Sequence, residues 1–83
     1  MFYKIEDVKA EPNGILYVYY HNNITKIYNM KLLASKNSKF QKVLEDTVFS
    51  SVYVGEDGCE VAWDNEHVLS SEEIWKNGVE VLV

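Results

Sequence analysis

The strongest constraint on the fold is a run of six strand-forming residues, 15–20 (Ile-Leu-Tyr-Val-Tyr-Tyr), which has a turn signal on each side. Glu11-Pro12-Asn13-Gly14 precedes the run and His21-Asn22-Asn23 follows it. Proline and glycine favour turns, and asparagine tolerates the positive φ of a tight hairpin. The pattern predicts an antiparallel hairpin whose second strand covers residues 24–29.

A two-residue loop at Asn22-Asn23 sets the expected register of this hairpin. It places Val18 opposite Ile27, Tyr20 opposite Thr25 and Tyr17 opposite Tyr28. The aliphatic face would then belong to the core and carry Leu16, Val18, Tyr20 and Ile27. The second face is the candidate partner surface, because aromatic residues bury much area at low entropic cost; it carries Tyr17, Tyr19, Lys26 and Tyr28. Ordinary strand composition, or a helix covering this face, is the alternative.

The rest of the chain predicts short strands and helices. We expect an N-terminal strand at 1–8 and a second antiparallel hairpin, strands 48–54 and 59–63, around Asp57-Gly58. In this hairpin Val54 faces Val61 and Val52 faces Trp63. The face expected in solvent carries Ser51, Tyr53, Glu60 and Ala62. Trp63 is expected in the core, packed by the helix that contains Ile74.

Capping motifs predict where the helices begin. A helical turn is expected at 30–35, and the capping box Ser38-Lys39-Phe40-Gln41 predicts a helix that follows it. A second box, Ser70-Ser71-Glu72-Glu73, predicts a helix that Gly78 ends in the left-handed conformation. The tail 79–83 alternates like a strand, and we expect it to pair with its own sheet. Pairing with a second copy, in a homodimer, and pairing with a partner protein are the alternatives.

These elements define an α+β fold of two antiparallel hairpins, an N-terminal strand and two short helices, in a single small domain over residues 1–83. No run of about 18 apolar residues predicts a membrane span. The N-terminus lacks the layout of a signal peptide, and the single Cys59 fits a reducing compartment, so a cytoplasmic protein is expected.

Charge is distributed unevenly along the sequence. Residues 1–42 hold seven lysines and three acids, a charge of +4, whereas residues 43–83 hold one lysine and ten acids, a charge of −9. The stretch 26–42 could serve a nucleic-acid-associated regulator, through a candidate basic set of Lys31, Lys36, Lys39 and Lys42. Because the chain has no arginine and its pI is near 4.9, nucleic acid is the less favoured partner.

Catalytic and metal-binding patterns are not readable in this sequence. Cys59 with His21 or His67 has no signature spacing, and the acids around the second hairpin do not follow an EF-hand order. The glycines are isolated, so no phosphate loop is predicted. We therefore expect no cofactor and no metal, and a small enzyme is the third alternative.

The order of features resembles domain-of-unknown-function family 2442, over roughly residues 5–77. The matching positions are Val8, Pro12-Asn13-Gly14, Leu16-x-Val18-x-Tyr20, Phe40-x-x-Val43-Leu44, Phe49-x-x-Val52, Gly58-x-x-Val61-x-Trp63-x-Asn65 and Leu69-Ser70-x-Glu72-x-Ile74-Trp75. The family's hairpin usually carries glycine where this chain has Asn23. The resemblance implies an α+β domain without an established activity, in some members the partner of a small adjacent-gene protein in a toxin–antitoxin-like pair. The expected function is a non-catalytic protein-interaction module.

Overall fold

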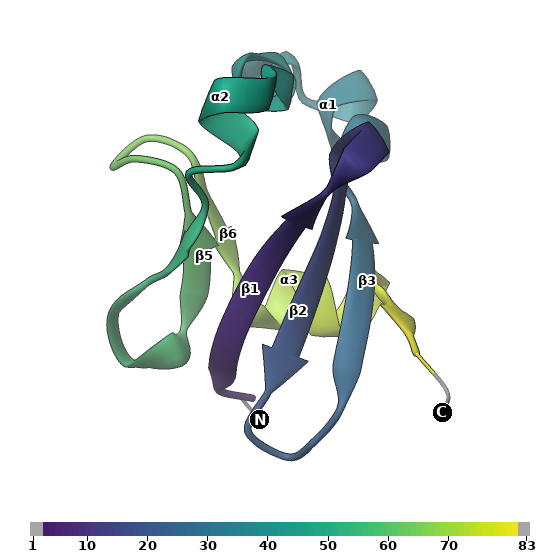
Figure 1. Cartoon of the computed structure of the whole chain (residues 1–83), viewed down its shortest axis with the longest axis vertical. Helices are drawn as coiled ribbons and strands as arrows, with labels where there is room; N and C mark the ends of the chain where they lie inside the picture. Colours follow the sequence, from purple (N-terminus) through teal and green to yellow (C-terminus); the bar gives the residue numbers. More distant parts are fainter. Residues whose placement is uncertain (1–2, 82–83) are drawn as a thin grey trace.

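The computed structural model describes residues 3–81 and confirms the predicted α+β class in one domain. Two antiparallel sheets enclose a core that short helices close at the upper end and behind (Figure 1). The strands are β1 (Ile5–Glu11), β2 (Ile15–Tyr20), β3 (Thr25–Asn29), β4 (Tyr53–Val54), β5 (Glu60–Ala62), β6 (Val68–Ser70) and β7 (Val79–Glu80). The α-helices are α1 (Met30–Lys36), α2 (Asp46–Phe49) and α3 (Ser71–Asn77), and the 3-10 helices are η1 (Pro12–Gly14), η2 (Ser38–Leu44) and η3 (Glu56–Gly58).

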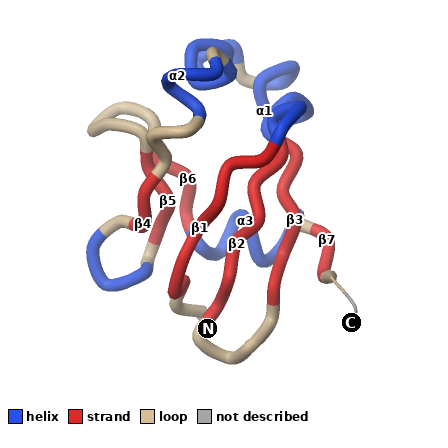
Figure 2. The backbone as a smooth tube through the Cα atoms, in the orientation of Figure 1, coloured by secondary structure: helices blue, strands red, loops and turns tan. Residues whose placement is uncertain are grey.

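The larger sheet has the strand order β1-β2-β3-β7, with β2 in its interior. The C-terminal tail pairs with β3 of its own sheet, as predicted: Val79 lies opposite Ile27, and Glu80 lies opposite Lys26. The Val81 amide also donates to the Thr25 carbonyl at 2.9 Å. Leu82 and Val83, which the predicted strand includes, lie outside the described residues. Figure 2 shows β7 as a short strand beside the lower part of β3.

The register of the first hairpin differs from the prediction by one residue. The loop has three residues, His21–Asn23, because the Tyr20 amide donates to the Ile24 carbonyl at 2.9 Å. Asn23 takes the left-handed conformation, with φ at 67°, which fits a three-residue hairpin loop. Tyr17 therefore faces Ile27, and Leu16 faces Tyr28. A one-residue slip moves each side chain of a strand to the other face, so Tyr28 is in the core and Ile27 is not.

The smaller sheet, of order β4-β5-β6, contains the second hairpin. Val54 faces Val61 as predicted. The strand predicted over 48–54 is shorter, since only Tyr53–Val54 is extended and residues 46–49 form α2. Ala62, expected in solvent, is buried because the unpredicted strand β6 pairs on its other side, with Val68 opposite Ala62.

Two predicted helix caps can be compared with the structure. One cap is at the predicted serine, and the other is one residue before it. The Ser70 hydroxyl accepts the Glu73 amide at 3.1 Å, as the second capping box predicts. At η2, however, the cap is Asn37 rather than Ser38, since the Asn37 side chain accepts the Lys39 amide. Gly78 is extended, at φ −80° and ψ 165°, so the predicted left-handed ending is wrong. Glycine is needed there for space: a Cβ would lie 2.5 Å from the Ile74 carbonyl oxygen.

The core joins both sheets to the helices. Trp63 is buried as predicted, but its aromatic neighbours come from η2 and α2. Its ring stacks on Phe49 with centroids 6.3 Å apart and meets Phe40 edge-on at 6.5 Å. The indole Nε1 donates to the Phe49 carbonyl at 3.2 Å. Trp63 thus fastens the segment after α1 to the smaller sheet.

Candidate functional site

The outer face of the larger sheet is the face turned away from α3 (Figure 1). Along β2 the buried and less buried residues alternate, so Leu16, Val18 and Tyr20 point to the core. The strand pairings then define the outer face as Asp7, Lys9, Glu11, Ile15, Tyr17, Tyr19, Thr25, Ile27, Asn29 and Val79. Among the described residues, no helix or strand packs over this face in Figure 1.

Charge and apolar surface are separated across this outer face. The charged residues belong to β1, where the Lys9 Nζ lies 3.2 Å from a Glu11 carboxylate oxygen. The hydrogen bond and the charge of Glu11 raise the pKa of Lys9. Lys9 faces Tyr17, which in turn faces Ile27, and Ile27 faces Val79. The face is therefore charged along β1 and mainly aromatic or aliphatic across β2, β3 and β7, where Thr25 and Asn29 are its polar residues.

A groove continues the apolar part of the outer face around the edge of β3. We call it the edge groove; its volume is about 540 Å³. Leu32 of α1 and Val79 of β7 are 61% and 68% exposed, the largest values among the exposed large apolar residues of the described chain. The lining residues are Ile15, Ile27, Tyr28, Asn29, Leu32, Leu33, Lys36, Glu73, Asn77 and Val79. Four residues, Ile15, Ile27, Asn29 and Val79, belong to both the groove and the outer face, so the two form one continuous surface.

A hydrogen-bonded carboxylate lies in the edge groove. One oxygen of Glu73, Oε2, accepts from the Tyr28 hydroxyl at 2.8 Å and from the Asn77 amide nitrogen at 2.8 Å. Burial raises the pKa of Tyr28, and the hydrogen bond to Glu73 raises it further. This network fixes the polar part of the groove and links β3 to α3.

The four residues of the predicted partner surface do not share one face of the sheet. Tyr17 and Tyr19 lie on the outer face, but Tyr28 is buried, and Lys26 lies opposite Val18 on the core side. The Lys26 Nζ is 4.6 Å from the centroid of the Trp75 ring, a cation–π distance. The reason is the register: with three loop residues instead of two, Lys26 and Tyr28 exchange faces with Ile27.

The four lysines of the predicted basic set lie on two different elements. Lys31 and Lys36 belong to α1, and Lys39 and Lys42 belong to η2. Lys36 lines the edge groove together with Glu73. Lys39 and Lys42 line a separate, open hollow of about 700 Å³, together with Asn65, Glu66, His67 and Val68. An acid accompanies the lysines in each hollow, which is unfavourable for phosphate binding.

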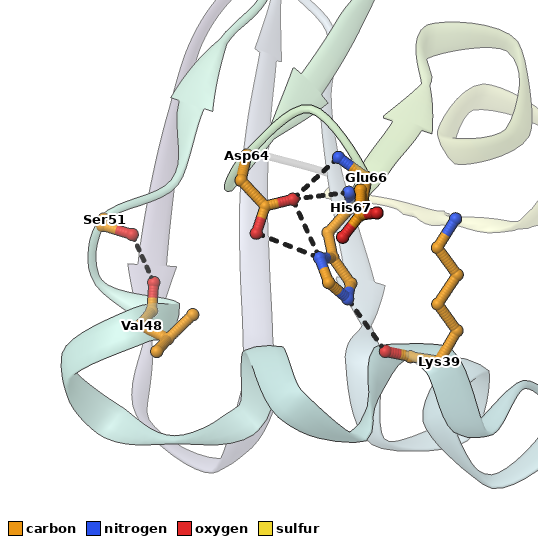
Figure 3. Close-up of polar contacts among 6 residues, drawn as sticks. All are labelled: Lys39, Val48, Ser51, Asp64, Glu66 and His67. Atoms are coloured by element: carbon orange, nitrogen blue, oxygen red, sulfur yellow. Dashed lines mark hydrogen bonds and ion pairs between the residues drawn. The ribbon is translucent and has the colours of Figure 1, made fainter.

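His67 is the one buried residue among those that line this second hollow, and both of its ring nitrogens have a hydrogen-bond partner (Figure 3). The ring Nδ1 lies 2.8 Å and 3.1 Å from the two carboxylate oxygens of Asp64. The ring Nε2 lies 3.1 Å from the Lys39 carbonyl oxygen. The hydrogen bond from His67 lowers the pKa of Asp64, and the Glu66 amide contributes to the same shift. Neither the composition nor a motif marks this pair, apart from its Asp-x-x-His spacing.

Among the described residues, no hydrogen bond joins Cys59 to His21 or His67. His67 is bound to Asp64 and Lys39, while His21 lies 3.6 Å from Glu6 on the surface. Within residues 3–81, no group of three or more histidine, cysteine, aspartate or glutamate side chains could hold a metal ion.

Comparison with known proteins adds no relative. No protein-family model matches the chain, and no curated protein or solved structure matches it at a significant level. Across the part of the chain that the structure describes, no helix combines the length and the apolar character needed to cross a membrane.

Proposed function

We propose that this protein is a non-catalytic protein-interaction module that binds its partner through the outer face and the edge groove. The observation that carries the proposal is the continuity of this surface. Tyr17 and Tyr19 lie on an uncovered sheet face, and Leu32 and Val79 stand exposed beside it. Contiguous exposed apolar surface with a polar margin is typical of a protein interface.

The outer face alone is small for a stable complex. Strands about 4.8 Å apart and about 3.3 Å per residue give a face of a few hundred Å² for four strands. A standard interface buries about 800 Å² on each partner. Because the edge groove extends the surface past β3 and onto α1, a partner that contacts both regions reaches the required area more readily.

The resemblance to family 2442 suggests what the partner is. In that family some members resemble partners of small adjacent-gene proteins, and we propose a protein of this kind, in the cytoplasm, as the partner here. Nucleic acid is not proposed, because Lys36 lines one hollow and Lys39 and Lys42 line another, and each hollow also contains an acid.

Paired substitutions test the proposal. The chain and the protein encoded beside it would be co-expressed and co-purified, with Leu32→Ser and Val79→Thr as the interface variant. Both side chains are already exposed, so the fold should be retained, as circular dichroism would check. We expect the partner to co-purify with the wild type and to be lost or strongly depleted with the variant.

Tyr53→Ser is the matched control. Tyr53 is also an exposed large side chain, 47% exposed, but it belongs to the smaller sheet. The control should retain the partner. Equal depletion in both variants, or a wild type that purifies alone and stays monomeric in sedimentation, would contradict the proposal.

A further inference from the structure

His67 is held between two groups that can only accept hydrogen bonds. Its Nδ1 faces the carboxylate of Asp64, and its Nε2 faces the backbone carbonyl of Lys39 (Figure 3). The residue is only 7% exposed. The small exposed part of the residue borders the open hollow, and both ring nitrogens already have partners within the protein.

The Asp64 carboxylate is held in its ionised, accepting form. One oxygen, Oδ1, receives the Glu66 amide, the His67 amide and the His67 Nδ1, each at 2.8 Å. Hydrogen bonds that favour the ionised form lower the pKa of a carboxyl group, as they do here. Asp64 therefore does not supply a proton to the ring.

A neutral imidazole cannot satisfy both contacts, because it carries one N–H donor and one bare nitrogen. With its proton on Nδ1, the lone pair of Nε2 would face the lone pairs of the Lys39 oxygen across 3.1 Å. Only the imidazolium donates at both nitrogens.

We propose that His67 is a proton-dependent latch. As an imidazolium it ties η2 to the loop between β5 and β6, through the Asp64 carboxylate and the Lys39 carbonyl. When the ring loses a proton it keeps Asp64, the stronger charge-assisted partner, and releases Lys39, which loosens η2. The latch goes beyond the proposed interface, because no residue of η2 lines the edge groove or belongs to the outer face.

Charged groups of both signs surround the ring. On one side, Lys39 and Lys42 of η2 line the open hollow together with Glu66 from the loop. On the other side, Lys42 and Glu45 line a smaller hollow of about 230 Å³ with Asp64 and His67. Glu45, Asp64 and Glu66 thus oppose two lysines near the ring. Phe40 packs edge-on against it, with centroids 5.9 Å apart, and offers no proton acceptor.

Nuclear magnetic resonance of the intact, nitrogen-labelled chain tests the latch. The ring nitrogens of His67 should both carry protons at about pH 5.5 and one should be bare at about pH 8.5, across the range in which histidine changes charge. Over the same interval the protection of η2 amides against hydrogen exchange should fall about tenfold, as expected for loss of a charge-assisted hydrogen bond. Amides of α3 provide the internal reference and should keep their protection.

Two variants separate the latch from general effects of pH. His67→Gln should abolish the pH dependence of η2 protection, since its side chain does not titrate. His21→Gln removes the exposed histidine and should leave that dependence unchanged. A bare ring nitrogen in the folded wild type at about pH 5.5 would overturn the proposal. The proposal would also be overturned if the protection of η2 amides showed the same pH dependence in His67→Gln as in the wild type. If His67→Gln does not fold, the spectrum of the wild-type ring decides the question by itself.

Discussion

The hydroxyl of Tyr28 donates to the carboxylate of Glu73 across 2.8 Å, which joins β3 to α3. Tyr28 is buried by its opposite neighbour Leu16 and by α3, and Glu73 also accepts from Asn77. Residues 45 positions apart in the sequence are thereby fixed to one another, and both of them line the edge groove.

Tyr28→Phe should therefore lower the free energy of unfolding by about 1.5–3 kcal/mol, the usual range for a hydrogen bond to a charged group. Urea denaturation would measure the loss. The matched control is Tyr17→Phe, on the outer face, which should stay within about 0.5 kcal/mol of the wild type. Equal effects at the two tyrosines would contradict the register of the hairpin.

The caps of α3 and η2 allow a second comparison. Ser70→Ala should cost about 1 kcal/mol, because the Glu73 amide loses its side-chain acceptor. Ser38→Ala should be close to neutral, since Asn37 caps η2 instead. Thermal unfolding of the two variants side by side checks this. An equal loss at both serines would place the start of η2 at Ser38 after all.

Trp63 should be the most sensitive aromatic position. Trp63→Ala removes the ring that packs on Phe40 and Phe49 and should cost on the order of 3–5 kcal/mol. For a domain this small that loss is a large share of its stability, so the variant should be unfolded or molten. Near-ultraviolet circular dichroism would detect the loss of fixed packing. Tyr53→Ala, at an exposed site, should retain a cooperative transition.

Asp64 predicts a pH dependence at acid pH. Its folded-state pKa lies below the ordinary value of 3.8, first because of the His67 hydrogen bond. A lowered carboxyl pKa stabilises the fold above the unfolded-state value and loses that effect as the pH falls through the folded-state value. The melting temperature of Asp64→Asn should therefore be below that of the wild type at about pH 5, and the difference should shrink below about pH 4. If the difference in melting temperature between Asp64→Asn and the wild type grew as the pH fell, the prediction would be wrong. Asp57→Asn controls for the change in net charge.

The C-terminal strand should contribute stability to its own chain. Truncation after Gly78 removes the pairing of Val79 and Glu80 with β3 and should cost about 1–2 kcal/mol. The loss should be the same at every protein concentration. Val79→Thr keeps the backbone hydrogen bonds and should cost much less. If truncation instead converts a dimer to a monomer in sedimentation, the tail pairs between copies.

Local chemistry predicted many elements of this fold. The strand-forming run at 15–20, the turns beside it, the pairing of Val54 with Val61 and the Ser70 cap all depend on residues close in sequence. Turn and cap preferences reflect backbone geometry and nearby hydrogen bonds, so they can be read without knowledge of the rest of the chain. Burial of Trp63 also follows from its place at the end of the apolar run Val61-Ala62-Trp63.

Longer-range contacts decided what the sequence left open. Two loop residues and three are both compatible with His21-Asn22-Asn23, and the choice determines which face Lys26 and Tyr28 occupy. Burial of the Tyr28 ring against α3, with Glu73 as its acceptor, accompanies the three-residue loop, and local preference does not encode that contact. The pairing of His67 with Asp64 and Lys39 likewise requires η2 to cross the β5–β6 loop, from 28 residues away. Such contacts exist only once both segments are in place, because their free energy depends on burial that the whole fold provides.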